Sequence, residues 1–388
     1  MRVVLAPDSF KGSLSAPEVC AALGRGIARA LPDARIVARP MADGGEGTLD
    51  AVLAAVGAAG RRHVLAVTGA GGAPVDAAWG EIGDGGAATA VIEVAQVVGI
   101  TDARAMAVPV ADRSTRGVGE LIAMLLDRGV RRFMIGLGGS STNDGGSGML
   151  AALGLSLADR DGRAVAPSPR ALATLAAVDA AGLDARLRDC EIRIMSDVNN
   201  PLCGDLGATA VFGPQKGVKP AEVPAFDATL ARFAELAEAA AGRRAARLPG
   251  AGAAGGLGFA LQLVGGAFAS GAAVVADLIG LDAALAGADW AITGEGRTDR
   301  QTLLAKAPFV VAQRAAAARV PVTLVSGAVD AGSLPELARH FAGCFALPNG
   351  PATLAECIAD AAALLEARAE QAARVFAAGR ASGNEGAG

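Results

Sequence analysis

Acidic residues embedded in glycine recur along this chain, each time directly after a short apolar run. The three clusters span residues 41–47, 136–146 and 293–299. A strand that runs into a glycine-rich turn exposes backbone N–H groups, and these groups bind anions. Carboxylates at the same turn would repel a bare phosphate, but they suit a phosphate that carries Mg²⁺. The pattern therefore indicates a nucleotide-dependent phosphoryl-transfer enzyme.

Strand-like and helix-like segments alternate at both ends of the chain. Ser15 precedes Glu18 by three residues, which predicts a capping box at the start of the first helix. Alternation of this kind predicts a parallel sheet that is covered by helices on both faces. The expected strands are 3–6, 35–38, 290–293, 322–326 and 344–347, and the expected helices are 15–31, 47–56, 301–318, 334–339 and 352–377.

The middle of the chain is more mixed. Two strands are expected at 79–82 and 90–94, and an antiparallel pairing is possible for them. Further strands at 133–137 and 191–195 alternate with helices, of which 225–241 is the most periodic. We therefore predict two α/β domains. Residues 1–75 plus 280–380 form one, with a parallel sheet built by both chain ends, and 76–279 form an inserted mixed-sheet domain; 381–388 are expected to be a disordered tail.

Composition excludes several classes of protein. Aromatic residues make up only 3% of the chain, the net charge is −4 and no basic stripe occurs, so nucleic-acid binding is not expected. The 5 cysteines are scattered without a CxxC pair, and the N-terminus lacks signal-peptide anatomy. These features predict a reduced, cytoplasmic protein. The uncharged stretch 248–276 is interrupted by glycine, so we expect a loop and a buried helix rather than a membrane span.

Histidine chemistry is also excluded. The only histidines, His63 and His340, lie outside the glycine–acid clusters, and tyrosine is absent. Catalytic triads and histidine-ligated metals are therefore not expected. The proton acceptors that remain are carboxylates.

The strongest local motif is the segment 133–150, in which an apolar strand enters a glycine-rich turn and a helix leaves it. Glycines allow close backbone approach, hydroxyl groups donate to phosphate oxygens, and Asp144 can reach a metal ion. The alternative is that Thr142, Asn143 or Asp144 only caps the helix. Lysine occurs only at positions 11, 216, 219 and 306. All but Lys219, which we interpret as an ordinary surface residue, lie near Gly, Pro or Ser, where an ammonium group suits an anion.

Three further motifs carry acidic or basic side chains at predicted strand ends. Asp43 and Glu46 can share one face near a helix start and hold Mg²⁺, or they can complement the helix dipole. Arg297, close to Glu295, can clamp a carboxylate or phosphate, with an internal salt bridge as the alternative. Asp197 is placed to act as a general base for a substrate hydroxyl, with an Asx-turn as the alternative.

One glycine pattern points elsewhere. Residues 250–255 match G-x-G-x-x-G, but no strand precedes them, and the chain contains no Walker A motif. An NAD-dependent hydroxy-acid dehydrogenase is the first alternative function, and it rests only on this match. A non-catalytic sensor of a small organic acid is the second alternative.

Six motif-like segments follow one another along the chain: 6–13, 41–48, 138–146, 200–204, 211–217 and 293–297. Taken in this order, they resemble the signatures of the bacterial glycerate kinase family, of the glycerate 2-kinase type. The resemblance implies ATP- and Mg²⁺-dependent phosphorylation of D-glycerate, with 2-phosphoglycerate as the expected product. It also implies two α/β domains, one of them flavodoxin-like, with the active site in the cleft between them. Ala305 departs from the pattern, because the family usually has glycine there.

The motifs and the resemblance together give a set of expected site residues. The choice between the C2 and C3 hydroxyl of glycerate, and the oligomeric state, stay open. The catalytic residues are Asp197, Lys11 and Arg297; the substrate-binding residues are Ser9, Lys11, Asn199, Arg297 and Lys306; the ATP-binding residues are Gly138, Gly139, Ser140, Ser141, Thr142, Asn143 and Lys216; the Mg²⁺ ligands are Asp43, Glu46, Asp144 and Glu295.

Overall fold

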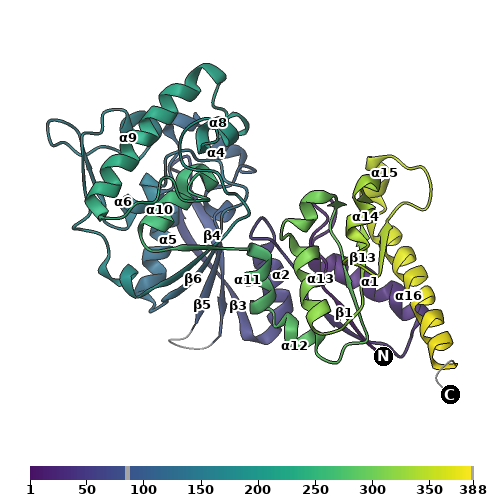
Figure 1. The fold of residues 1–388 in the computed structure, drawn as a ribbon. Coiled ribbons are helices and arrows are strands. Elements are labelled where there is room, and N and C mark those ends of the chain that lie inside the picture. Colours follow the sequence, from purple (N-terminus) through teal and green to yellow (C-terminus); the bar gives the residue numbers. More distant parts are fainter. Residues whose placement is uncertain (84–87, 386–388) are drawn as a thin grey trace. The chain divides into compact units, whose positions relative to one another are not determined.

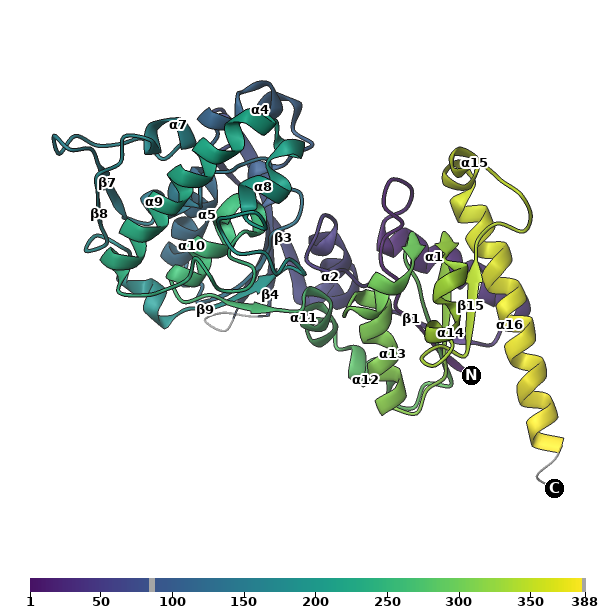
Figure 2. The same ribbon diagram turned by 45° about the horizontal axis from the view of Figure 1, so that its top comes forward.

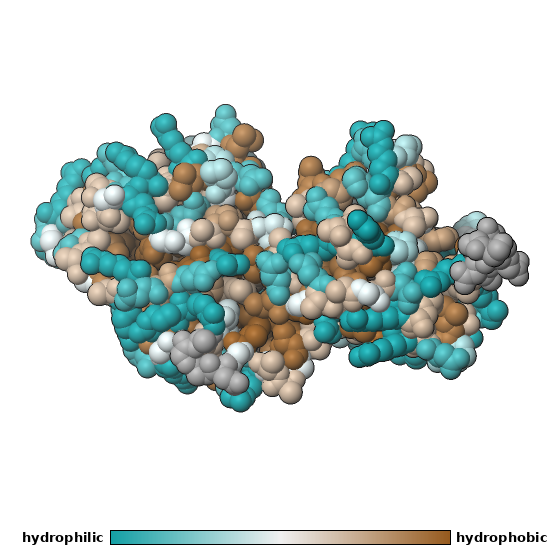
Figure 3. Space-filling view, turned by 60° about the horizontal axis from the view of Figure 1, so that its bottom comes forward, coloured by the Kyte–Doolittle hydropathy of each residue, from teal (hydrophilic) through white to brown (hydrophobic). Residues whose placement is uncertain are grey.

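The computed structural model of the chain describes residues 1–83 and 88–385 (Figure 1). The chain forms two compact units. Unit 1 comprises Met1–Asp43, Asp50–Gly57 and Ser270–Gly388, and unit 2 comprises Gly44–Leu49 and Ala58–Ala269. On the face drawn in Figure 3, hydrophilic side chains are interspersed with several apolar areas.

The sheet of unit 1 joins strands from both ends of the chain. Its order is β15-β13-β11-β1-β2, and every neighbouring pair is parallel. When the five strands are numbered in chain order within unit 1 and read from β2 to β15, they follow the flavodoxin-like order 2-1-3-4-5. The predicted parallel sheet is therefore confirmed. Its strands are β1 (Arg2–Leu5), β2 (Arg35–Ala38), β11 (Trp290–Thr293), β13 (Val322–Ser326) and β15 (Gly343–Ala346).

Helices cover both faces of this sheet, as Figure 1 and Figure 2 show. On one face α1 (Ala16–Ala30) packs along α16 (Ala361–Glu385), and on the other α13 (Ala307–Ala317) packs beside α11 (Gly271–Leu278). Helix α1 begins with the expected capping box, in which the Ser15 amide donates to Glu18 Oε2 at 2.8 Å. Gly26 lets the first pair approach closely, because a Cβ there would collide with the carbonyl oxygen of Glu366.

The C-terminal helix extends beyond the expected end at residue 377. It is preceded by the short α15 (Leu354–Ala359) and ends at Glu385. Of the tail expected to be disordered, 381–388, residues 386–388 lie outside the described part of the chain.

The sheet of unit 2 is mixed, as predicted. Its order is β10-β9-β6-β5-β4-β3, in which β3, β4 and β5 are antiparallel neighbours and the other pairs are parallel. Trp79 on β4 faces Ile92 on β5, which confirms the antiparallel option. The strands are β3 (Gly60–Thr68), β4 (Pro74–Ile82), β5 (Thr89–Glu93), β6 (Arg132–Gly136), β9 (Glu191–Met195) and β10 (Ala267–Ala269).

The glycine-rich stretch after residue 248 packs inside unit 2. Helix α10 (Leu257–Leu263) is buried along its whole length. A Cβ at Gly255 would collide with the Thr142 carbonyl oxygen, and the Gly145 amide donates to the Gly255 carbonyl at 2.9 Å. Gly255 of the G-x-G-x-x-G match thus allows this segment to pack closely against the backbone of the loop at 142–146. None of the described helices is long and apolar enough to cross a bilayer.

The remaining elements are short or connect these layers. They are α2 (Thr48–Val56), α3 (Ala95–Val98), α4 (Ala103–Ala107), α5 (Arg116–Asp127), α6 (Ser147–Ala152), α7 (Pro169–Leu172), α8 (Ala208–Phe212), α9 (Val223–Ala241), α12 (Leu281–Leu285), α14 (Leu334–Leu337), β7 (Ser156–Ala158), β8 (Ala177–Asp179), β12 (Arg297–Thr298) and β14 (Ala328–Val329).

Candidate active site

A cavity of about 600 Å³ opens in unit 1 at the carboxyl ends of its strands. Asp8 follows β1, Glu295 follows β11, Gly327 follows β13 and Leu347 follows β15, and all four residues line it. Ligands of open α/β sheets bind at this edge. Six of the expected site residues meet here: Ser9, Lys11, Asp43, Glu295, Arg297 and Lys306.

The two cations expected to hold the substrate are only loosely paired. Lys11 Nζ lies 3.8 Å from Asp43 Oδ2, and Arg297 Nε lies 3.9 Å from Asp299 Oδ2. The Lys11 and Arg297 side chains are 73% and 76% exposed. Exposed ion pairs of this length contribute little to stability, so both cations remain available to an anionic ligand.

Glu295 is held in one orientation by two threonines. Its Oε1 accepts hydrogen bonds from Thr298 Oγ1 at 3.1 Å and from Thr302 Oγ1 at 2.5 Å, and the residue is 8% exposed. Burial raises the pKa of this carboxyl, while the Thr302 hydroxyl and the Lys306 ammonium act in the opposite direction. The arrangement fixes a carboxylate at the carboxyl end of β11.

Asp8 belongs to the same cavity, and the sequence interpretation did not select it. One carboxylate oxygen accepts a hydrogen bond from the Ser9 amide at 2.6 Å, and the residue is 8% exposed. Burial and then the nearby Asp43 raise the pKa of Asp8 to about 7; Lys11 lowers it and Glu295 raises it. Asp8, Asp43 and Glu295 thus bring carboxylates together at a place where a bound cation would relieve their repulsion.

We expect Asp8→Asn to stabilise the metal-free protein at pH 8 by about 2 kcal/mol and to have little effect at pH 4. The folded-state pKa is raised, so this carboxyl contributes stability below its unfolded pKa that is lost as the pH rises through about 7. Urea unfolding at the two pH values, with a chelator present, measures the difference. An equal effect of the substitution at both pH values would contradict this assignment.

The predicted nucleotide loop lies in unit 2, and most of its side chains point inward. Gly139 is exposed, whereas Ser140 is 6% exposed and Ser141, Thr142 and Asn143 are fully buried. Ser141 Oγ donates to the Val98 carbonyl at 2.9 Å, and Asn143 Nδ2 donates to Thr209 Oγ1 at 2.9 Å. These two side-chain donors serve the interior, so the part of the loop open to a ligand is the backbone around Gly138 and Gly139.

Lys216 forms hydrogen bonds to this loop from the interior of unit 2. It is 2% exposed, and its Nζ donates to the Thr142 carbonyl at 2.8 Å and to Ser140 Oγ at 3.1 Å. Burial lowers the pKa of Lys216 to about 7, and Asp144 opposes that shift. The buried Arg113 donates to the carbonyl oxygens of both Ser141 and Lys216. The lysine therefore positions the loop from within unit 2.

Asp144, like Lys216, is buried and hydrogen-bonded within unit 2. The residue is fully buried, and its carboxylate accepts hydrogen bonds from the Thr115 amide and hydroxyl at 2.8 Å and from the Gly146 and Gly148 amides at 3.1 Å. Burial raises the pKa of Asp144, and these hydrogen bonds lower it. The bonds favour a structural role, although the N-cap of α6 is Gly146 rather than Asp144, so we leave Asp144 out of the proposed metal ligands.

Other expected residues gather at the carboxyl edge of the unit 2 sheet. Asp197 and Asn199 are exposed in the turn after β9, and Glu46 is exposed in the segment 44–49. That segment packs on the sheet edge, since a Cβ at Gly138 would lie 2.7 Å from the Gly45 Cα. The structure thus brings Glu46 and Asp197 to the same edge as the accessible glycines of the loop.

Comparison with known proteins gives the family of this chain. The Glycerate kinase family matches residues 3–377. This chain belongs to the glycerate kinase family. It is 41% identical over 379 residues to "Glycerate kinase" of Bacillus subtilis (strain 168), covering 96% of this chain and 97% of that protein. It is 43% identical over 330 residues to "Glycerate 2-kinase" of Escherichia coli (strain K12), covering 85% and 86%.

A solved structure of the same family supports the fold directly. A presumed glycerate kinase 2 from Salmonella typhimurium LT2 superposes with a TM-score of 0.86 at 40% sequence identity, covering 98% of this chain and 99% of that one. The family resemblance predicted from the motifs is confirmed.

The residues that can hold a metal ion in this member of the glycerate kinase family are few. Among residues 1–83 and 88–385, no group of three or more His, Cys, Asp or Glu is placed to hold one. Asp43 and Glu295 line one cavity, however, and Mg²⁺ is commonly bound by one or two carboxylates together with phosphate oxygens. Their oxygen donors fit Mg²⁺.

Ala305 shows what the departure from the family pattern means physically. Its φ is 65°, a left-handed conformation that favours glycine, and it directly precedes Lys306 at the cavity. The expected family glycine thus corresponds to a backbone requirement, which alanine meets here with some strain.

Proposed function

We propose that this protein is a glycerate kinase that transfers the γ-phosphoryl group of ATP to D-glycerate, with 2-phosphoglycerate as the product. Family membership along nearly the whole chain supports the proposal, and the cavity of unit 1 is the observation that carries it. Its exposed cations suit a small carboxylate, and its carboxylates suit Mg²⁺.

The roles of the residues follow from their chemistry. Lys11, Arg297 and Lys306 would bind the glycerate carboxylate, while Ser9 offers a hydroxyl to the substrate. The backbone of Gly138 and Gly139 would contact phosphate oxygens. Mg²⁺, held by Asp43 and Glu295 with Glu46 as a further candidate, would offset the charge of the phosphates.

The reaction itself needs one base. A glycerate hydroxyl oxygen forms a bond to the γ-phosphorus, the bond from that phosphorus to the β–γ bridging oxygen breaks, and ADP leaves. Asp197 would accept the hydroxyl proton, and Asn199 in the same turn would orient the substrate. Residues of both units contribute to this proposal; a common site between the units stays a prediction.

A coupled assay tests the function against its alternatives. Glycerate-dependent release of ADP supports the kinase. A change in NAD absorbance with a hydroxy acid and no ATP would instead support the dehydrogenase, and thermal stabilisation by glycerate without turnover would support the sensor. Phosphorus NMR of the product distinguishes the 2-phosphate from the 3-phosphate.

We expect Arg297→Ala to raise the KM for glycerate by about tenfold or more, because a charge-assisted hydrogen bond to a carboxylate contributes about 1.5–3 kcal/mol. The KM for ATP should change little. Arg300→Ala is the matched control, since the Arg300 side chain is 74% exposed three residues further along the chain and is not part of the described cavity wall. Equal kinetics for the two variants would remove Arg297 from substrate binding.

A further inference from the structure

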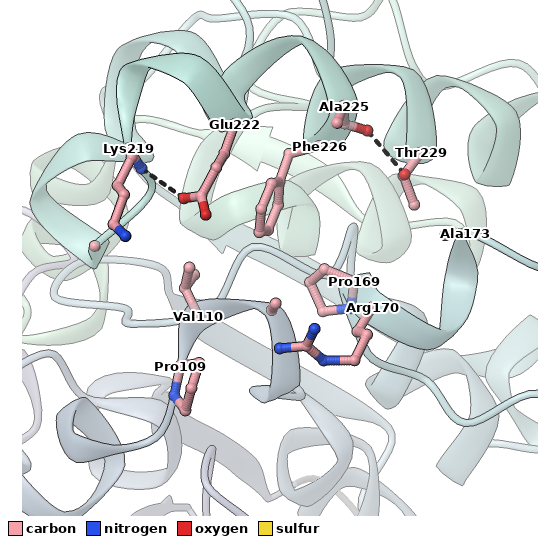
Figure 4. Close-up of a pocket in the computed structure, with 12 residues that line it drawn as sticks. Pro109, Val110, Pro169, Arg170, Ala173, Lys219, Glu222, Ala225, Phe226 and Thr229 are labelled. Carbon is pink, nitrogen blue, oxygen red and sulfur yellow. Dashed lines mark hydrogen bonds between the residues drawn. The ribbon is translucent and has the colours of Figure 1, made fainter.

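A second cavity lies entirely within unit 2, and none of the roles above uses it. Its volume is about 420 Å³, within the range of small-molecule sites. Its walls come from the 3-10 helix η3 (Val110–Asp112), from α7, from the 3-10 helix η6 (Pro220–Glu222) and from the start of α9. Figure 4 shows that Phe226 points into this space from α9.

Phe226 and Arg170 both line this cavity. In Figure 4 the guanidinium group of Arg170 extends into the space opposite the Phe226 ring, and Val110 closes the side. Two hydrogen bonds to Asp112, at 2.6 and 3.0 Å, hold that guanidinium in place. An aromatic ring and a guanidinium group that line one cavity favour a planar heteroaromatic ligand, because each can stack on such a ring.

The rim carries polar groups that suit the rest of a nucleotide. Lys219 and Glu222 line the cavity together, and the Lys219 amide donates to Glu222 Oε2 at 2.9 Å. The exposed ammonium of Lys219 suits a phosphate, and the carboxylate of Glu222 can accept hydrogen bonds from ribose hydroxyls. Lys219, which the sequence suggested was an ordinary surface lysine, therefore has a place in this site.

Buried side chains connect the wall of this cavity to the glycine loop. Gly217 in its wall directly follows Lys216, whose ammonium lies 3.1 Å from Ser140 Oγ. Arg113, which directly follows η3, donates to the carbonyls of Ser141 and Lys216. The Lys216 side chain and its hydrogen bond to Ser140 thus connect the cavity wall with the loop at 138–144.

We propose that this cavity binds the adenine ring of ATP, with the ring between Phe226 and Arg170. The assignment rests on the proposed kinase function for the identity of the nucleotide. Unit 2 would then bind the adenine base in this cavity and the phosphates at the glycine loop.

Isothermal titration of the full chain with ATP, without glycerate, tests the assignment. Phe226→Ala is expected to weaken ATP binding by about tenfold or more, since loss of one base–aromatic stack costs about 1–3 kcal/mol. Phe226→Tyr keeps the stack and should bind ATP like the parent. Leu236→Ala is the control, a half-buried apolar residue on the same helix outside the cavity. Circular dichroism verifies that each variant is folded.

The outcomes separate this assignment from the kinase function. Phe226-dependent ATP binding without glycerate turnover supports the cavity and contradicts the kinase. Normal turnover with an unchanged KM for ATP in Phe226→Ala overturns the cavity alone. A further outcome is that added AMP changes the turnover rate of the parent. If Phe226→Ala loses only this effect and keeps the parental KM for ATP, the cavity serves an effector and the assignment is overturned. Absence of ATP binding by the parent chain overturns both.

Discussion

Replacement of Asp144 by asparagine is expected to lower the free energy of unfolding by about 3–5 kcal/mol, because several buried donors lose a charged acceptor. The carboxylate receives hydrogen bonds from the amides of Thr115, Gly146 and Gly148 and from the Thr115 hydroxyl. An asparagine offers one acceptor oxygen and turns an NH₂ group toward the remaining donors. Urea unfolding of the parent and the variant measures the loss.

A graded series keeps this prediction testable if Asp144→Asn does not fold. Thr115→Val removes one donor to the carboxylate and the acceptor of the Met149 amide, and should cost about 1–2 kcal/mol. Thr115→Ser keeps the hydroxyl and should remain close to the parent. If Asp144 were instead a metal ligand, its variant would keep normal stability and lose activity that added Mg²⁺ partly restores.

The same residue shows where prediction from sequence ends. The strand, the glycine turn and the helix around it followed from local patterns, since apolar runs and turn residues act within a few positions. Whether the turn's side chains face solvent depends on the segment 250–256, which packs its own backbone against residues 142–146. No local pattern contains that contact, so the burial of these hydroxyls and of the carboxylate could not be predicted from the motif.

Two omissions have equally specific causes. Strand β3 carries Arg61, Arg62 and His63, and charges suppress the apolar signal of an edge strand even though they suit one. Asp8 stands alone after β1 without the glycine surroundings of the other acidic residues, and its importance appears only when Asp43 and Glu295 line the same cavity. By contrast, Lys11 and Lys306 were selected because lysine is rare in this chain and both lie near Gly, Pro or Ser, and Arg297 because it follows a predicted strand; all three line the cavity.

Asp197→Asn is expected to lower kcat by about a hundredfold or more with little change in the KM for glycerate, because a positioned base contributes about 10²–10⁴-fold. Asp197 is exposed in the turn after β9, at the carboxyl end of a strand with parallel neighbours on both sides. Asp189 provides a matched control, since it is an exposed aspartate that precedes the same strand, at the opposite edge of the sheet.

Steady-state kinetics of the two variants distinguish a base from a surface charge. Ligands of parallel sheets bind at the carboxyl edge, so Asp189→Asn should keep parental kcat while Asp197→Asn loses it. A base also gives the parent an acidic limb in its pH–kcat profile, which the Asp197→Asn variant should lack. If kcat of Asp197→Asn stays within about threefold of the parent, another group must accept the proton.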